Sequence, residues 1–303
     1  METLIVLFSL LFPALKVSVP YDMISHYYYG CGGYSLEEEV GMSADALDRM
    51  IEDASRMIAG SKHVVALTGA GISVESGIPP FRGPGGLWTK YGEPDNKGYQ
   101  RFLQDPKAWW EARLRGEGVR PEMHSFDGAA PNPGHYALAE LEAAGVLKYL
   151  ITQNVDNLHY AAGNKNVAEI HGNRYKLRCI SCIARFPQGS LPLDDLPPRC
   201  PECGGIVKTD GVAFGEPIPT DVLEICRREA MSSDCTVVIG TSAVVYPAAE
   251  LPVMSKRRGA YLIEVNPYET DLSFMCDLSL QGASGEVLPT LVSRVKELVA
   301  GKS

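Results

Sequence analysis

The chain has 303 residues, of which 45% are hydrophobic and 21% charged, and its formal net charge at pH 7 is -9. A chain of this length can bury a large core in one or two domains. The negative charge disfavours strong nucleic-acid binding, because phosphate backbones are bound by clustered lysine and arginine. The sequence holds no apolar run long enough for a transmembrane helix, so we expect no membrane span.

Residues 1–41 form an N-terminal tail that is apolar from Leu4 to Leu15. The tail is similar to a secretory signal, but no Lys or Arg precedes the apolar run and no clean small-x-small cleavage site follows it. A misassigned start codon is the alternative, since Met42 lies just before a segment with a helical pattern. We hypothesise that the working protein begins near Met42, which N-terminal sequencing of the native protein would test.

From Met42 onward, short apolar runs alternate with amphipathic segments. The first such segment follows Ser43, which can cap a helix. Apolar runs predict strands at 63–68, 146–152, 166–170, 235–240 and 260–265, and helical periodicity predicts helices near 106–115, 134–145, 219–231, 247–258 and 285–300. Continuous apolar strands separated by helices are typical of a buried parallel sheet. We therefore predict an α/β protein with a doubly wound, Rossmann-like parallel sheet over residues 42–303.

Two segments interrupt the alternation, and we predict that they form a smaller lobe. One is a helical insert at 84–130, and the other is a Cys- and Pro-rich insert at 172–212. The second insert contains two CxxC pairs separated by 17 residues, which supply Cys179, Cys182, Cys200 and Cys203. This spacing is typical of a zinc ribbon in which all four coordination positions are thiolates. A disulfide pair or a redox CxxC is the alternative, and we predict one structural Zn²⁺.

Small and polar residues follow each predicted strand, where ligands bind in open α/β sheets. Gly69-Ala70-Gly71 follows the first strand, but the third glycine of a dinucleotide fingerprint is replaced by Val74. The other strand ends carry Gln153, Asn154 and Asp156, then His171, then Gly240, Thr241 and Ser242, and finally Asn266. Each residue alone is more often a turn or a helix cap. Because five strand ends share this character, we predict a ligand site along this edge.

The motifs taken together resemble the sirtuins, a family of Sir2-type NAD-dependent protein-lysine deacylases. The resemblance covers residues 43–300 and rests on GAGIS (69–73), SGIPPFRG (76–83), TQNVDNLH (152–159), HG (171–172), the cysteine ribbon, FGE (214–216), GTS (240–242), VNP (265–267) and GASGEVLP (282–289). It implies that the acyl-lysine carbonyl oxygen attacks the nicotinamide ribose, nicotinamide leaves and the acyl group passes to ADP-ribose. It also implies that Phe81 and Arg82 close over that ribose, where an aromatic lid would exclude water.

The resemblance assigns roles to individual residues. His171 is the expected general base, with Asn154 and Asp156 as further catalytic residues. The expected NAD-binding residues are Gly69, Ala70, Gly71, Ser73, Phe81, Arg82, Trp88, Gln153, Asn154, Asp156, Gly240, Thr241, Ser242, Asn266 and Ser284. The expected peptide-binding residues are Val212, Phe214, Gly215 and Glu216, which would pair with the substrate as an added strand.

The preferred acyl group is a separate question. Sirtuins that remove succinyl and malonyl groups carry a Tyr-x-x-Arg pair, and this chain has Trp110-x-x-Arg113 in the helical insert. Arg113 could bind a carboxylate, but a solvated arginine beside a core tryptophan is the more common arrangement. We therefore predict deacetylation, with removal of acidic acyl groups left open.

Two other functions stay open at this point. The same fold could carry out protein ADP-ribosylation or NAD hydrolysis, and a zinc ribbon could belong to a non-enzymatic binding module. The second alternative is disfavoured by the negative charge and by the complete set of motifs. Reduced zinc thiolates and a soluble cofactor favour the cytoplasm.

Overall fold

The structure, a computed structural model, describes residues 43–117 and 126–301. The tail at 1–41, the proposed start at Met42 and part of the helical insert lie outside the described residues, so the expectations about them stay predictions. Within the described ranges, no helix is both long and apolar enough to cross a bilayer.

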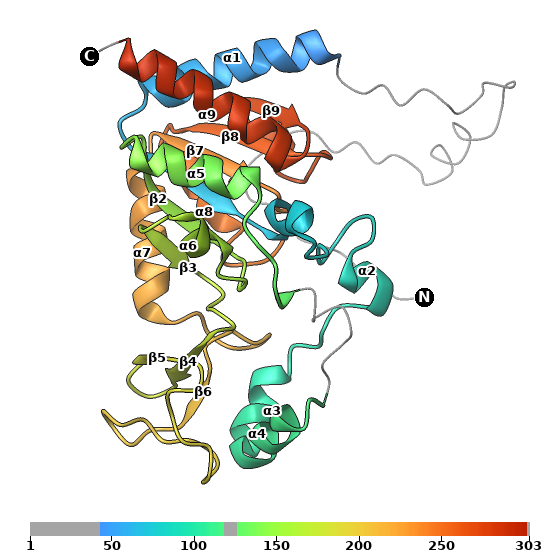
Figure 1. The fold of residues 1–303 in the computed structure, drawn as a ribbon, viewed down its shortest axis with the longest axis vertical. Helices are drawn as coiled ribbons and strands as arrows, with labels where there is room; N and C mark the ends of the chain where they lie inside the picture. The colour runs from blue at the N-terminus through green and yellow to red at the C-terminus, as the bar shows by residue number, and fades with distance from the viewer. Residues whose placement is uncertain (1–42, 118–125, 302–303) are drawn as a thin grey trace, which may run out of the picture. The chain divides into compact units, whose positions relative to one another are not determined.

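A six-stranded parallel sheet forms the centre of the fold (Figure 1), in the order β3-β2-β1-β7-β8-β9. Its strands are β1 (Val64–Thr68), β2 (Leu147–Thr152), β3 (Val167–Glu169), β7 (Cys235–Ile239), β8 (Tyr261–Asn266) and β9 (Leu278–Gln281). Every adjacent pair is parallel. The chain winds outward from β1 in one direction and from β7 in the other, which places a crevice between β1 and β7. The predicted doubly wound sheet is confirmed.

Helices cover both faces of this sheet. The first face carries α1 (Ala44–Gly60), α5 (Pro133–Ala143) and α9 (Ser284–Ala300), and the second carries α7 (Thr220–Ser232) and α8 (Glu250–Arg257). The strand β1 shows how one apolar run serves two cores: Val64 and Ala66 pack in the first core, whereas Val65 and Leu67 pack in the second. Alternation of side chains along a strand divides the run in this way.

The two inserts pack together as a smaller lobe, as predicted. The helical insert contains α2 (Leu87–Tyr91), α3 (Gly98–Gln104) and α4 (Pro106–Leu114), and the cysteine-rich insert contains β4 (Lys176–Cys179), β5 (Arg185–Pro187) and β6 (Val207–Thr209). These three strands form an antiparallel sheet in the order β5-β4-β6. The indole Nε1 of Trp110 on α4 donates to the carbonyl oxygen of Val207 on β6 at 2.9 Å, which joins the inserts.

Short elements were the ones that sequence patterns missed. They include α2, α3, the strands β4, β5 and β6 of the small sheet, β9, the helix α6 (Leu158–Ala162) and the 3₁₀ helices η2 (Ala70–Ser76) and η4 (Ser273–Met275). A strand of four residues has too few alternations to show a period. β9 is held by parallel pairing with β8, a contact that no local pattern reports.

Candidate active site

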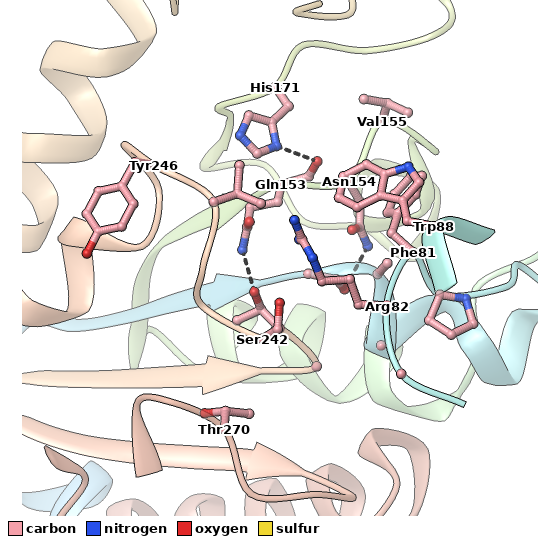
Figure 2. Close-up of a pocket in the computed structure, with 18 of the residues that line it drawn as sticks. Phe81, Arg82, Trp88, Gln153, Asn154, Val155, His171, Ser242, Tyr246 and Thr270 are labelled. Atoms are coloured by element: carbon pink, nitrogen blue, oxygen red, sulfur yellow. Dashed lines mark hydrogen bonds between the residues drawn. The ribbon is translucent and has the colours of Figure 1, made fainter. Parts of the chain in front are cut away.

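A cavity of about 1230 Å³ lies at the carboxyl ends of the sheet strands (Figure 2). Its lining includes residues that follow β1, β2, β3, β7 and β8, so the five predicted strand ends do meet. The lining contains the following predicted residues: Gly69, Ala70, Gly71, Phe81, Arg82, Trp88, Gln153, Asn154, His171, Val212, Phe214, Gly215, Glu216, Gly240, Thr241, Ser242, Asn266 and Ser284. The cavity lies where open α/β sheets bind ligands.

Glycines let the loops after β1 and β7 touch through their backbones. The amide of Gly71 donates to the carbonyl oxygen of Gly240 at 2.7 Å. A Cβ on Gly71 would lie 2.6 Å from the Cα of Gly240, and a Cβ on Gly69 would lie 2.6 Å from the Cβ of Thr241. Gly240 also has a φ of +58°, a backbone angle that residues with a side chain rarely adopt. This end of the cavity is therefore lined by backbone and can admit a ligand close to the main chain.

The loop after β2 is fixed by its amide side chains. Asn154 donates through Nδ2 to the Gly69 carbonyl oxygen and to Ser73 Oγ, at 3.1 Å each. Gln153 donates through Nε2 to Thr241 Oγ1 at 2.8 Å. These bonds hold the loop after β2 against the loops after β1 and β7.

Ser73 and Asp156 lie behind the cavity and are not part of its lining. Asp156 accepts from Ser73 Oγ at 2.7 Å and from the amide of Leu158 at 2.9 Å. Burial raises the pKa of the Asp156 carboxyl, with these hydrogen bonds opposing the shift. The geometry gives both residues a supporting role through Asn154 and shows no direct path from them to a ligand.

His171 follows β3 and lines the cavity. Its Nδ1 lies 3.2 Å from the carbonyl oxygen of Gln153. A carbonyl can only accept, so Nδ1 carries the proton and Nε2 is left as a base. Burial lowers the pKa of His171, while the bond to Gln153 opposes the shift. The imidazole is therefore neutral near neutral pH and able to accept a proton.

Aromatic rings form the wall nearest the glycine loop (Figure 2). The ring centroids of Phe81 and Trp88 are 4.8 Å apart, and those of Trp88 and Phe214 are 5.4 Å apart. The guanidinium of Arg82 lies 4.5 Å from the centre of the Trp88 ring and pairs with Glu93 at 2.7 Å. Such a wall excludes water from the adjacent space.

The segment 212–216 also lines the cavity, and its Phe214 contacts the aromatic wall at Trp88. The amide of Val212 donates to the carbonyl oxygen of His171 at 2.9 Å. Gly215 has a φ of +79°, and a Cβ there would lie 2.2 Å from the Asn96 carbonyl oxygen. The Glu216 carboxylate is buried against Arg178 and Lys208. Glu216 thus shapes the segment through its side chain.

Further polar groups of the cavity lining lie next to the loops after β1 and β7. Asn266 donates through Nδ2 to the Thr241 carbonyl oxygen at 3.1 Å. The Glu75 carboxylate accepts hydrogen bonds from the Gly285 backbone amide at 2.7 Å and from the Ser284 hydroxyl at 3.3 Å. Sequence analysis did not find Glu75, although an acidic residue facing a helix N-terminus is favourable.

Trp110 and Arg113, which were predicted to contact the acyl group, lie outside the cavity lining. Trp110 is buried in the core of the small lobe with Leu177 and Val207. Arg113 lies on the exposed surface of α4, with its guanidinium 5.7 Å from the centre of the Trp109 ring. The core reading of Trp110 is the one the geometry supports.

The four predicted cysteines converge into one cluster. Their sulfur atoms all lie within 4.8 Å of one another. The Sγ atoms of Cys179 and Cys203 are 3.5 Å apart, and those of Cys182 and Cys200 are 3.6 Å apart. Zinc–sulfur bonds of about 2.3 Å place the corners of a tetrahedron about 3.8 Å apart. The cluster therefore fits one Zn²⁺ with a closed shell of thiolates.

Two further residues at the site escaped sequence analysis. Asn132 caps α5 and donates through Nδ2 to the Ile72 carbonyl oxygen at 2.7 Å, which supports the glycine loop. Tyr246 lines the cavity with 74% of its surface exposed. The sequence PNPGH (131–135) carries a cap signal for Asn132, whereas a lone tyrosine in a loop carries no signal.

Comparisons with known proteins agree on one family. A model of the Sir2 family matches residues 69–247. An Archaeoglobus fulgidus protein named NAD-dependent protein deacylase 1 is 45% identical over 251 residues, which cover 83% of this chain and 100% of that protein. A solved complex of a Sir2 homologue variant with ADP-ribose is 45% identical, with a TM-score of 0.69, and covers 82% of this chain and 98% of its own. A Sir2 homologue–NAD complex is 42% identical, with a TM-score of 0.68, and covers 91% and 99%.

Proposed function

The chain belongs to the Sir2 family, and we propose that its cavity removes acyl groups from protein lysine side chains while consuming NAD. The observation that carries this proposal is the neutral imidazole of His171 in the cavity wall, with Nδ1 bound to the Gln153 carbonyl and Nε2 left as a base. NAD is written here as a substrate, because the reaction consumes it.

The cavity has the features that a dinucleotide requires. Its volume of about 1230 Å³ exceeds the range of roughly 300–1,000 Å³ for ordinary small-molecule pockets. Its backbone-lined end at Gly69, Gly71 and Gly240 admits close approach of a phosphate, as glycine-rich turns after strands do. Asn266 and Ser284 supply polar groups farther along the lining, where an adenosine would lie.

The protein side chains divide the remaining work. NAD supplies an electrophilic ribose carbon once nicotinamide leaves, and the acyl oxygen of the substrate adds there. Phe81, Trp88 and Phe214 keep water away from that carbon. Arg82 lies beside this wall and is paired with the exposed Glu93 carboxylate at 2.7 Å. Asn154 holds the loop that faces the nicotinamide half.

His171 acts after nicotinamide has left. Its Nε2 takes the proton of a ribose hydroxyl, which then attacks the acyl carbon. The lysine amine leaves from that carbon, and one water restores the carbonyl, so that the acyl group ends on the ribose. The Val212 amide donates to the His171 carbonyl oxygen, so the base is hydrogen-bonded through its backbone to the segment that would pair with the peptide. We propose an acetyl group as the preferred acyl, because Trp110 and Arg113 do not reach the cavity.

The test compares His171→Ala with the wild-type protein on an acetyl-lysine peptide and NAD, followed by peptide mass and nicotinamide release. We expect deacetylation to fall by roughly 10²- to 10⁴-fold, the usual contribution of a general base. His63→Ala is the matched control, since His63 pairs with Glu229 at 2.9 Å and is not part of the cavity lining. Parallel assays with a succinyl-lysine peptide test the acyl preference.

Other outcomes would replace this function. Nicotinamide release without a deacylated peptide would indicate ADP-ribosyl transfer or NAD hydrolysis. Retention on DNA that weakens with salt would revive a nucleic-acid role, which the net charge of -9 disfavours.

The four-thiolate cluster fits a reducing compartment, and we propose the cytoplasm.

A further inference from the structure

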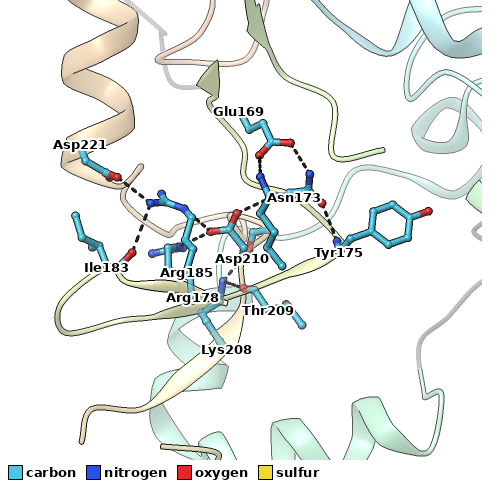
Figure 3. Close-up of polar contacts among 12 residues, drawn as sticks. Glu169, Asn173, Tyr175, Arg178, Ile183, Arg185, Lys208, Thr209, Asp210 and Asp221 are labelled. Carbon is cyan, nitrogen blue, oxygen red and sulfur yellow. Dashed lines mark hydrogen bonds and ion pairs between the residues drawn. The ribbon is translucent and has the colours of Figure 1, made fainter. Parts of the chain in front are cut away.

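A buried carboxylate in the small lobe holds the turn that carries His171. The turn consists of residues 171–173, and the backbone amide of Asn173 donates to Oδ2 of Asp210 at 3.0 Å (Figure 3). Gly172 has a φ of +76°, and a Cβ there would lie 2.2 Å from the Asp210 carbonyl oxygen. Asp210 thus contacts the turn through both its side chain and its backbone.

The other oxygen of the same carboxylate faces the small sheet. Oδ1 of Asp210 accepts from Nε of Arg178 at 3.0 Å and from Nε of Arg185 at 3.2 Å. Arg178 lies on β4 directly before the metal-ligating Cys179 and also pairs with Glu216 at 2.6 Å. One carboxylate therefore connects the zinc-bearing sheet, the catalytic turn and, through Arg178, the peptide-binding segment.

An aspartate is specifically required at this position. The side chains of Asp210 and Arg178 are 2% and 5% exposed, so water cannot replace a lost partner. The side-chain partners of the carboxylate are two guanidinium groups and one backbone amide, all of which donate. An asparagine would direct its own NH₂ group at one of these donors and leave a buried pair unsatisfied.

We propose that Asp210 is a positioning residue that fixes His171 relative to the ribose by anchoring the 171–173 turn to the small sheet. Asp210 is not part of the cavity lining, so it acts through His171 and not on the substrate. The inference rests on the proposed deacylase function. It predicts that loss of Asp210 harms the step that needs the base more than the step before it.

The experiment uses two readouts on the full-length protein. Exchange of labelled nicotinamide into NAD, in the presence of acetyl-lysine peptide, reports nicotinamide release before His171 acts. Deacetylation reports the whole sequence. In Asp210→Asn we expect the ratio of deacetylation to exchange to fall by roughly 10- to 100-fold, the range for a misplaced catalytic group. A role in folding alone would lower both rates equally and leave the ratio unchanged.

Two further variants make the result decisive. Asp221→Asn is the matched control, because the Asp221 carboxylate pairs with Arg185 at 2.8 Å and does not bind the described 171–173 turn. The ratio in this variant should stay at the wild-type value. Arg185→Gln removes one donor from Asp210 at a side chain that is 26% exposed, so it should fold and lower the ratio severalfold even if Asp210→Asn does not.

The outcomes separate the two proposals. If the wild-type protein neither exchanges nicotinamide nor deacetylates, the proposed function fails. If the wild-type protein does both, and the ratio is unchanged in a folded Asp210→Asn, the positioning role is wrong. If Asp210→Asn does not fold, an unchanged ratio in Arg185→Gln overturns the role in the same way.

Discussion

The large sheet and the small lobe are stabilised by different physical means. Both faces of the large sheet carry extensive apolar cores, from Ile51 and Leu150 on one side to Leu67 and Leu262 on the other. The apolar cluster that joins the two inserts of the small lobe has five buried residues among those that the structure describes, which are Trp110, Leu177, Cys179, Cys200 and Val207. Two of those five are predicted metal ligands, so this cluster buries less apolar surface than either core of the large sheet.

Buried ion pairs occupy positions in the small lobe where the large sheet has apolar side chains. The side chains of Arg178, Lys208, Asp210 and Glu216 are each at most 5% exposed and pair with one another. Buried ion pairs add little net stability over apolar packing, but breaking one is costly. The stability of the small lobe therefore depends on the exact geometry of a few buried pairs, whereas the stability of the large sheet depends on its total buried apolar area.

The largest expected effect comes from removing the metal. In Cys200→Ser we expect loss of zinc, loss of deacetylation and unfolding of the small lobe, because a structural zinc contributes on the order of 10 kcal/mol. The helices that cover the large sheet should stay folded and keep the helical circular dichroism signal, since the two cores of the sheet contain none of the four cysteines.

Cys276→Ser serves as the control for this change, since Cys276 lies outside the cysteine cluster. The Cys276→Ser protein should retain one zinc per chain. Full activity in a zinc-free Cys200→Ser protein would contradict the comparison. Measured zinc content and thermal unfolding decide between the two results.

An intermediate effect is expected from a cavity in the large sheet. Leu150 on β2 is fully buried, so Leu150→Ala should lower the free energy of unfolding by about 2–5 kcal/mol. Zinc content and activity at low temperature should be unchanged, because β2 has no partner in the small lobe's sheet. Urea unfolding measures the change, and Leu103→Ala at a 49% exposed position should shift stability by about 0.5 kcal/mol or less. Zinc loss in Leu150→Ala would show that the two regions are coupled.

The smallest effect concerns a buried histidine behind the glycine loop. Burial lowers the pKa of His135 from 6.5 to about 4. The unfolded chain takes up a proton below about pH 6.5 while the folded chain does not, so stability is complete above that pH and is lost as the pH falls. At pH 5 the loss is roughly 2 kcal/mol, since each pKa unit corresponds to 1.36 kcal/mol.

The measurement compares urea unfolding of wild type and His135→Gln at pH 7 and pH 5. We expect the wild type to lose about 2 kcal/mol more than the variant over this interval. His159, whose ring centroid is 4.9 Å from that of His135, is present in both proteins. Equal losses would mean that His135 is protonated in the folded protein.

The sequence by itself determined the parts that rest on local pattern. Apolar runs of five to seven residues predicted the main strands, because a strand buried on both faces is apolar throughout. The CxxC spacing predicted the cysteine cluster, because paired thiolates on tight turns are typical zinc ligands. The polar strand ends predicted the cavity, since parallel strands bring their carboxyl ends to one edge.

Only the tertiary structure decided what lies in front of the cavity and what lies behind it. Asp156 shares a motif with Asn154 yet lies behind the cavity lining, and Trp110 is turned into the small lobe. Asp210 carries no motif signal, and its role comes from contacts with residues 37, 32 and 25 positions away in the chain. Such contacts depend on how the inserts pack, and no period or spacing in the sequence records that packing.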